Sequence, residues 1–157
     1  MELLQILERY APFNEQEARD RAVLMGLLRT GQDLWTRENE AAHLTASAWV
    51  VNGDRERVLM AYHNIYDSWS WLGGHADGER DLLAMREVRE ESGLARVAPV
   101  SEALFSLEIL TVDGHEKRGR YVPSHLHLNL TYLLEADEHE LLAVKPDENS
   151  AVAWFGR

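Results

Sequence analysis

The feature that most constrains this chain is a charged segment, residues 86–94, with the sequence Arg-Glu-Val-Arg-Glu-Glu-Ser-Gly-Leu. Its composition favours a helix over residues 82–92, and Gly93 favours the end of that helix. At about 100° of rotation per residue, the glutamates fall within an arc of about 100°, and the apolar side chains occupy another face. The glutamates are Glu87, Glu90 and Glu91, and the apolar residues are Leu82, Met85 and Val88.

Three carboxylates on one helix face repel one another, and a divalent cation between them would relieve that repulsion. Hard oxygen ligands suit Mg²⁺, with Mn²⁺ as a second choice. The alternative is a solvated charged helix, because Arg86 and Glu90 also form an ordinary i,i+4 pair. The pair Gly73-Gly74 before the helix and Gly93 after it favour the metal site.

The rest of the chain predicts strands mixed with a few helices, and therefore one domain of the α/β or α+β class over residues 1–157. Asn14 is the expected N-cap of the second helix. Residues 113–124 are polar and predict a mobile loop. Helices are expected over 2–10 and 15–30, a hairpin over 44–51 and 57–62, a loop from there to the glycine pair, and strands over 103–112, 126–135 and 151–155.

Composition excludes several classes of protein. The formal net charge of −11 disfavours binding to nucleic-acid polymers. The absence of cysteine excludes disulfides, thiolate zinc sites and cysteine nucleophiles. No apolar stretch approaches the roughly 20 residues that cross a bilayer. The N-terminus also lacks the pattern of a signal peptide, so we expect a cytoplasmic protein.

The segment Gly-Gly-His-Ala-Asp-Gly-Glu at residues 73–79, followed by residues 86–94, resembles the Nudix signature G-x5-E-x7-R-E-U-x-E-E-x-G-U, where U is aliphatic. The second half matches at every specified position. The resemblance extends to residues 44–51, 125–127 and 147–149, and it is nearest to a bacterial subgroup with a G-G-H-A-D-G loop. It implies a Nudix-type α/β/α sandwich with a mixed β-sheet, in which residues 1–40 form a helical extension and residues 73–94 form the box.

The first half of the box departs from the signature in spacing. The expected first glycine falls at Leu72 and the expected first glutamate at Gly78, so that, measured from Gly74, the segment is two residues short. Two helical residues correspond to about 200° of rotation and about 3 Å of rise. The loop or the first helical turn must therefore be rebuilt, which leaves the downstream glutamates intact and the role of Glu79 open.

The resemblance implies a metal-dependent pyrophosphohydrolase, acting on the diphosphate linkage of a nucleoside diphosphate joined to another group, or of a similar small molecule. Glu87, Glu90 and Glu91, with the carbonyl of Gly74, would hold Mg²⁺. The other expected roles are a general base from Glu90, Glu91 or Glu148, orientation by Arg86, His75 and Glu79, and phosphate binding by Arg118 and Arg120, which are otherwise solvated.

Other residues admit more than one interpretation. His125 and His127 face one way on a strand and could form half of a metal site, but no third ligand is obvious, so a structural or substrate-facing role is favoured. The aromatic residues Tyr66, Trp69 and Trp71 could stack on a base, although a place in the core is favoured.

Two rival functions remain. A catalytically weak or inactive nucleotide-binding or regulatory module would share the fold. An allylic diphosphate isomerase would also share it, but in this family that chemistry uses a cysteine, which the chain lacks. Relatives generally continue beyond Phe155 into a closing helix. Either the N-terminal helices or a partner chain would cover that face here, so a homodimer is a further hypothesis.

Overall fold

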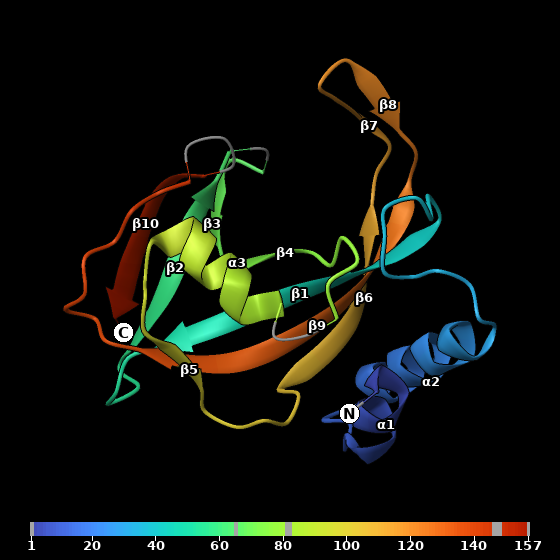
Figure 1. Ribbon diagram of the computed structural model, residues 1–157, viewed down its shortest axis with the longest axis horizontal. Coiled ribbons are helices and arrows are strands. Elements are labelled where there is room, and N and C mark those ends of the chain that lie inside the picture. Colours follow the sequence, from blue (N-terminus) through green and yellow to red (C-terminus); the bar gives the residue numbers. More distant parts are fainter. Residues whose placement is uncertain (1, 65, 81–82, 146–148, 157) are drawn as a thin grey trace. The chain divides into compact units, whose positions relative to one another are not determined.

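The computed structural model describes residues 2–64, 66–80, 83–145 and 149–156. These residues form helices and strands in two compact units, which are described separately (Figure 1). The first unit comprises Met1–Ala46, His75–Arg80 and Ala103–Leu130. The second comprises Ser47–Gly74, Asp81–Glu102 and Thr131–Arg157. The strands that contribute residues to both are β1 (Ala42–Val51), β4 (Leu72–His75) and β9 (His125–Ala136).

The first unit begins with the two predicted helices, α1 (Leu3–Arg9) and α2 (Glu15–Arg29), which pack side by side (Figure 1). The side chain of Asn14 accepts a hydrogen bond of 2.9 Å from the backbone N–H of Glu17, so the predicted N-cap is confirmed. Helix α2 also contacts strand β6 (Ser106–Val112). Both helices therefore bury an apolar side against their own unit, with Leu7 and Leu24 almost fully buried.

The predicted mobile loop over 113–124 is wrong. Strand β7 (His115–Lys117) pairs antiparallel with β8 (Arg120–Val122) in a separate two-stranded sheet. The two turn residues, Arg118 and Gly119, have φ angles of 52° and 76°, the left-handed conformation that a tight hairpin turn requires. The hairpin escaped prediction because it buries no apolar face, so its sequence shows no alternation of apolar and polar residues.

The second unit contains the predicted hairpin, β1 with β2 (Arg57–His63), paired antiparallel with Val50 opposite Leu59. On the other side of β2 lies β10 (Asn149–Gly156), also antiparallel. The order along the sheet is β10-β2-β1-β9-β5, with β3, β4 and β6 paired off this path. Strand β5 (Val97–Pro99) was not predicted, because three residues that include a proline carry too little strand signal.

The predicted loop that includes the glycine pair contains two short strands, β3 (Ser68–Ser70) and β4. Its aromatic residues do not lie in the core: Tyr66 is 62% exposed, Trp69 39% and Trp71 37%. Trp69 instead packs edge-on against Phe155, with ring centroids 4.8 Å apart. The prediction of a core role was wrong because aromatic rings can bury area against one another on a sheet face.

The charged segment forms helix α3 (Leu83–Ser92), close to the predicted span, whose first residue lies outside the described part. Gly93 has a φ of 75° and donates its N–H to the carbonyl of Arg89 at 2.9 Å, so the predicted helix end is confirmed. Val88 is fully buried, and the helix contacts β5 and β10. Since Val88 anchors one face, the polar face of α3 has a defined orientation within the second unit.

Candidate functional site

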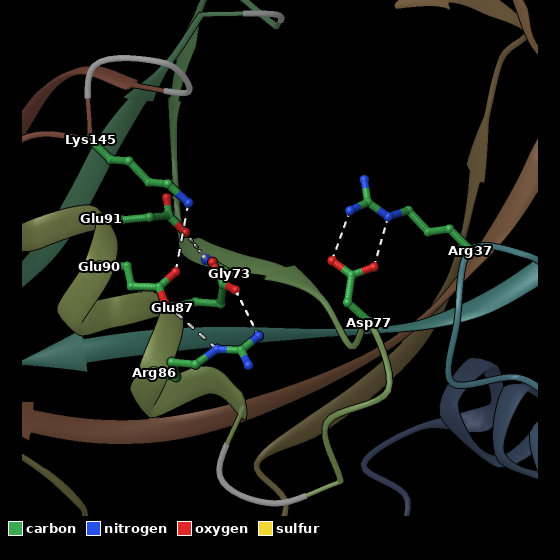
Figure 2. Close-up of polar contacts among 8 residues, drawn as sticks. All are labelled: Arg37, Gly73, Asp77, Arg86, Glu87, Glu90, Glu91 and Lys145. Carbon is green, nitrogen blue, oxygen red and sulfur yellow. Dashed lines mark hydrogen bonds and ion pairs between the residues drawn. The ribbon is translucent and has the colours of Figure 1, made fainter.

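The three glutamates of α3 differ in burial and in partners, although all lie near the strand that carries Gly73 (Figure 2). Glu87 is 7% exposed and Glu91 only 3%, whereas Glu90 is exposed. A buried carboxylate is costly unless hydrogen bonds or cations stabilise its charge. The two buried glutamates therefore need specific partners, and the structure supplies them.

Glu91 is held at both of its oxygens. Its Oε1 accepts a hydrogen bond of 3.0 Å from the backbone N–H of Gly73, and its Oε2 accepts one of 2.9 Å from Nδ2 of Asn149. Asn149 is itself fully buried at the start of β10. Two hydrogen bonds thus fix the position of this carboxylate, and a carboxylate oxygen that accepts a hydrogen bond can also bind a cation.

Glu87 packs directly against the backbone of Gly74. A Cβ atom built on Gly74 would lie 2.7 Å from Cδ and 2.7 Å from Oε2 of Glu87, which is closer than real side chains allow. Glycine lets the carboxylate take this position, because a side chain on Gly74 would push the end of Glu87 away from the backbone. The glycine pair and the glutamates of α3 form one packed arrangement.

Two cations accompany the glutamates (Figure 2). A guanidinium nitrogen of Arg86 lies 3.4 Å from Glu87 Oε1, and another lies 3.9 Å from Glu90 Oε1. Nζ of Lys145 lies 3.6 Å from Glu90 Oε2. Arg86 therefore contacts two of the three glutamates. Lys145 was not foreseen, since nothing in its sequence neighbourhood links it to α3.

Burial, reinforced by the nearby charge of Glu90, raises the pKa of Glu87 above its ordinary value, and Arg86 opposes that rise. A divalent cation would favour the ionised form in the same way, and more strongly. The three carboxylates and the close Gly74 backbone thus fit Mg²⁺ in donor chemistry. The three carboxylates now contact different partners. A cation shared by all three would replace the contacts that Glu90 makes with Arg86 and Lys145.

The other predicted site residues belong to the first unit or lie outside the described residues. Glu148 lies outside the described residues. Glu79 is exposed in a tight turn of the first unit, where Asp77 and Gly78 have φ angles of 48° and 87°. Arg118 and Arg120 are exposed on the β7–β8 hairpin. None of their predicted roles follows from the contacts within their own unit.

The first unit contains a cluster of histidines, of which the sequence predicted only one pair. His125 and His127 were expected on one face of a strand, and the structure adds His43 from β1. One potential ligand nitrogen from each of the three lies within 4.8 Å of the others. Among the described residues, no other group of three histidine or acidic side chains brings its potential ligand atoms this close together. His75 also lies here, with its ring 5.0 Å from that of His127.

A family model described as the NUDIX domain matches residues 41–157, which begin after α1 and α2. Comparison with curated proteins found no significant match. Among solved structures, a C. elegans Ap4A hydrolase in a binary complex is similar, at 16% identity and a TM-score of 0.52, over 72% of this chain and 79% of that one.

An E. coli dihydroneopterin triphosphate pyrophosphohydrolase is similar at 17% identity and a TM-score of 0.52, over 72% of this chain and 80% of that one. These likenesses confirm the predicted Nudix-type α/β fold. Within the described residues, no helix is long and apolar enough to span a membrane. Because the family model spans most of the sequence, including the glycine pair and all of α3, the chain belongs to the NUDIX domain family.

Proposed function

We propose that this chain is a divalent-metal-dependent hydrolase that cleaves a diphosphate linkage in a nucleoside diphosphate joined to another group, or in a similar small molecule. One observation carries the proposal: two buried carboxylates of α3, Glu87 and Glu91, are built against Gly74 and Gly73. A charged helix with no function has no reason to bury two glutamates at the expense of their hydration. The names of the similar structures, a hydrolase and a pyrophosphohydrolase, support the same class of reaction.

The residues that would hold Mg²⁺, or Mn²⁺, are Glu87, Glu90 and Glu91, with the carbonyl of Gly74 as a further ligand. When bound, such a cation lowers the pKa of a water molecule and neutralises charge on phosphate oxygens. Glu91 is fixed by two hydrogen bonds and suits a permanent ligand. Glu90 is exposed and forms longer ion pairs with Arg86 and Lys145, so it is our first choice for the general base.

The remaining roles are extensions of this proposal. Arg86 orients Glu87 and Glu90 through charge-assisted contacts. The exposed hairpin residues Arg118 and Arg120 contact substrate phosphates. His75 and Glu79 orient groups around the box, and Glu148 is a second choice for the base. The chain belongs to the G-G-H-A-D-G subgroup and acts in the cytoplasm. It assembles as a homodimer.

The decisive experiment is phosphate release from a panel of nucleotide sugars, dinucleotide cofactors, oxidised nucleotides and prenyl diphosphates, with and without Mg²⁺. We expect turnover of at least one compound that requires the metal and is abolished in Glu90→Gln and Glu91→Gln. Glu102→Gln, an exposed glutamate of the same unit, is the matched control. Unchanged rates in the α3 variants would contradict the proposal. Tight nucleotide binding without any turnover would instead identify a binding or regulatory module.

A further inference from the structure

Four histidines meet in the first unit, contributed by three strands. His43 lies near the start of β1, His75 ends β4, and His125 and His127 lie at the start of β9. The ring centroid of His43 lies 4.8 Å from that of His125 and 5.2 Å from that of His127. Strands β1 and β9 are neighbours in the sheet. The adjacent strands thus bring together residues that lie far apart in the sequence.

The nitrogens of three of these rings point at one another. Nε2 of His125 lies 3.0 Å from Nε2 of His127, and a ring nitrogen of His43 completes a set within 4.8 Å. In a tetrahedral zinc site with Zn–N bonds of about 2.0–2.1 Å, neighbouring ligand nitrogens are about 3.3–3.4 Å apart. The three nitrogens already converge, and a bound metal would replace the hydrogen bond between His125 and His127 and draw the set closer together.

Backbone carbonyls set the tautomers of two of the rings. Nδ1 of His43 lies 3.0 Å from the carbonyl of Asn39, and Nδ1 of His125 lies 2.8 Å from that of Pro123. A carbonyl oxygen can only accept, so each Nδ1 carries the proton and each neutral ring presents an Nε2 lone pair. Metal-bound histidines are oriented in this way, by donating the other ring N–H to a carbonyl or carboxylate.

His43 supplies an independent sign of a missing ligand partner. It is only 5% exposed, and its Nε2 is buried with no hydrogen-bond partner among the described residues. A buried acceptor left without a partner costs about 1–3 kcal/mol. The hydrogen bond to Asn39 accounts for Nδ1 of His43 and leaves the buried Nε2 unexplained.

The electrostatic surroundings keep the rings in the form that binds metals. Burial lowers the pKa of His43, and it lowers that of His127 to about 4, so both are neutral near neutral pH. Arg37 adds to both shifts, but its guanidinium is paired with the carboxylate of Asp77 through two hydrogen bonds of 2.8 Å (Figure 2).

We propose that His43, His125 and His127 form a second metal site, selective for Zn²⁺ or a similar transition metal, with water or His75 in the fourth position. Imidazole nitrogens suit these metals, whereas Mg²⁺ requires oxygen ligands. The site is separate in chemistry from the carboxylates of α3. The inference does not depend on the proposed hydrolase activity, because it rests only on the histidine geometry of the first unit.

The test uses tag-free, full-length protein stripped with chelator and returned to buffer with excess Mg²⁺, which saturates carboxylate sites. Titration with Zn²⁺, followed by elemental analysis, should give one metal per chain. Co²⁺ should give the intense visible absorption of a tetrahedral complex. In His127→Ala the affinity should fall by at least the roughly 10–100-fold that loss of an outer-shell partner causes. His139→Ala, an exposed histidine of the second unit, should bind as the wild type does.

Several results would overturn the site: no bound Zn²⁺ in the wild type, the weak spectrum of octahedral Co²⁺, or unchanged affinity in His127→Ala. Thermal unfolding without metal checks that each variant folds. If His127→Ala does not fold, His125→Gln carries the same expectation, and the wild-type Co²⁺ spectrum decides without any substitution. The readout is metal binding, so failure here is distinct from failure of the phosphate-release assay.

Discussion

Two regions of this protein concentrate ionisable side chains, and they control charge in opposite ways. In the second unit, the glutamates of α3 lie within five consecutive residues, 87–91. Their negative charge is stabilised by Arg86, Lys145 and the backbone N–H of Gly73. In the first unit, the histidines come from three strands, and burial keeps His43 and His127 neutral. The first arrangement favours hard cations, and the second favours metals that bind nitrogen.

The comparison shows that clustering alone does not decide what a group of ionisable residues does. Glu87 has its pKa raised by burial, and so holds its proton more strongly than a free glutamate. His127 has its pKa lowered by burial, and so loses its proton more readily. The same physical cause, removal from water, acts against the charged form in both cases.

The largest effect is expected from removing a carboxylate of α3. Glu87→Gln should reduce Mg²⁺-dependent hydrolysis by about 100- to 1,000-fold, the loss typical when one preorganised electrostatic contact leaves an active site. Steady-state kinetics on the best substrate of the panel measures this loss. The same variant should leave Zn²⁺ binding in the first unit unchanged, so a loss of both would break the distinction between the two regions.

The pH dependence of stability should have opposite signs in the two regions. Since the pKa of His127 falls from 6.5 to about 4, its contribution to the metal-free protein is complete above pH 6.5 and is lost as the pH falls toward 4. At about 1.4 kcal/mol per pKa unit, the loss reaches on the order of 3 kcal/mol. Urea unfolding measures the free energy of unfolding at each pH. Between pH 4 and 8, this free energy should depend less steeply on pH in His127→Gln than in His139→Gln.

Glu87 should act in the other direction. Its folded pKa lies above the ordinary value of 4.5, so the folded state binds the extra proton, and metal-free stability falls as the pH rises through that interval. Glu87→Gln should remove this fall, and Mg²⁺ should oppose it in the wild type by stabilising the ionised form. The measurement is the free energy of unfolding against pH, without metal, for the wild type and Glu87→Gln. A rise with pH in the wild type that Glu87→Gln removes would contradict the burial argument.

A smaller effect is expected from Gly74→Ala. The new methyl group would meet the end of the Glu87 side chain at 2.7 Å, and a carboxylate end can swing away at little cost to folding. We expect Mg²⁺ affinity to fall by about 10-fold, comparable to the loss of an outer-shell contact, with little change in melting temperature. Gly53→Ala is the control, because nothing lies within 4 Å of its added Cβ. Equal affinity in both variants would sever the link between Gly74 and Glu87.

The smallest effect concerns Arg37. Its pair with Asp77 is about half exposed on both sides, so Arg37→Gln should cost less than about 1 kcal/mol in stability. Because Arg37 lowers the pKa of His43 and His127, the variant should raise both values, as measured by NMR titration of the ring protons. Unchanged histidine pKa values would show that burial and the neighbouring histidines, without Arg37, keep these rings neutral.

Features encoded within a few consecutive residues could be predicted. The N-cap at Asn14, the helix end at Gly93 and the shared face of Glu87, Glu90 and Glu91 depend only on the 3.6-residue period and on local hydrogen bonds. The family also followed from residues 86–94, whose pattern is continuous. Prediction failed where the local signal was weak, as in the β7–β8 hairpin, or where exposed aromatic rings such as Trp69 looked like core residues.

The sequence by itself therefore determined a NUDIX chain with three carboxylates on one helix face, because residues within one helical turn or two are placed by the helix alone. Only the tertiary structure decided which carboxylates are buried, that Lys145 and Asn149 serve Glu90 and Glu91, and that His43 joins His125 and His127. The reason is physical. Strand pairing and burial bring together residues far apart in the chain, and a one-dimensional pattern does not record those distances.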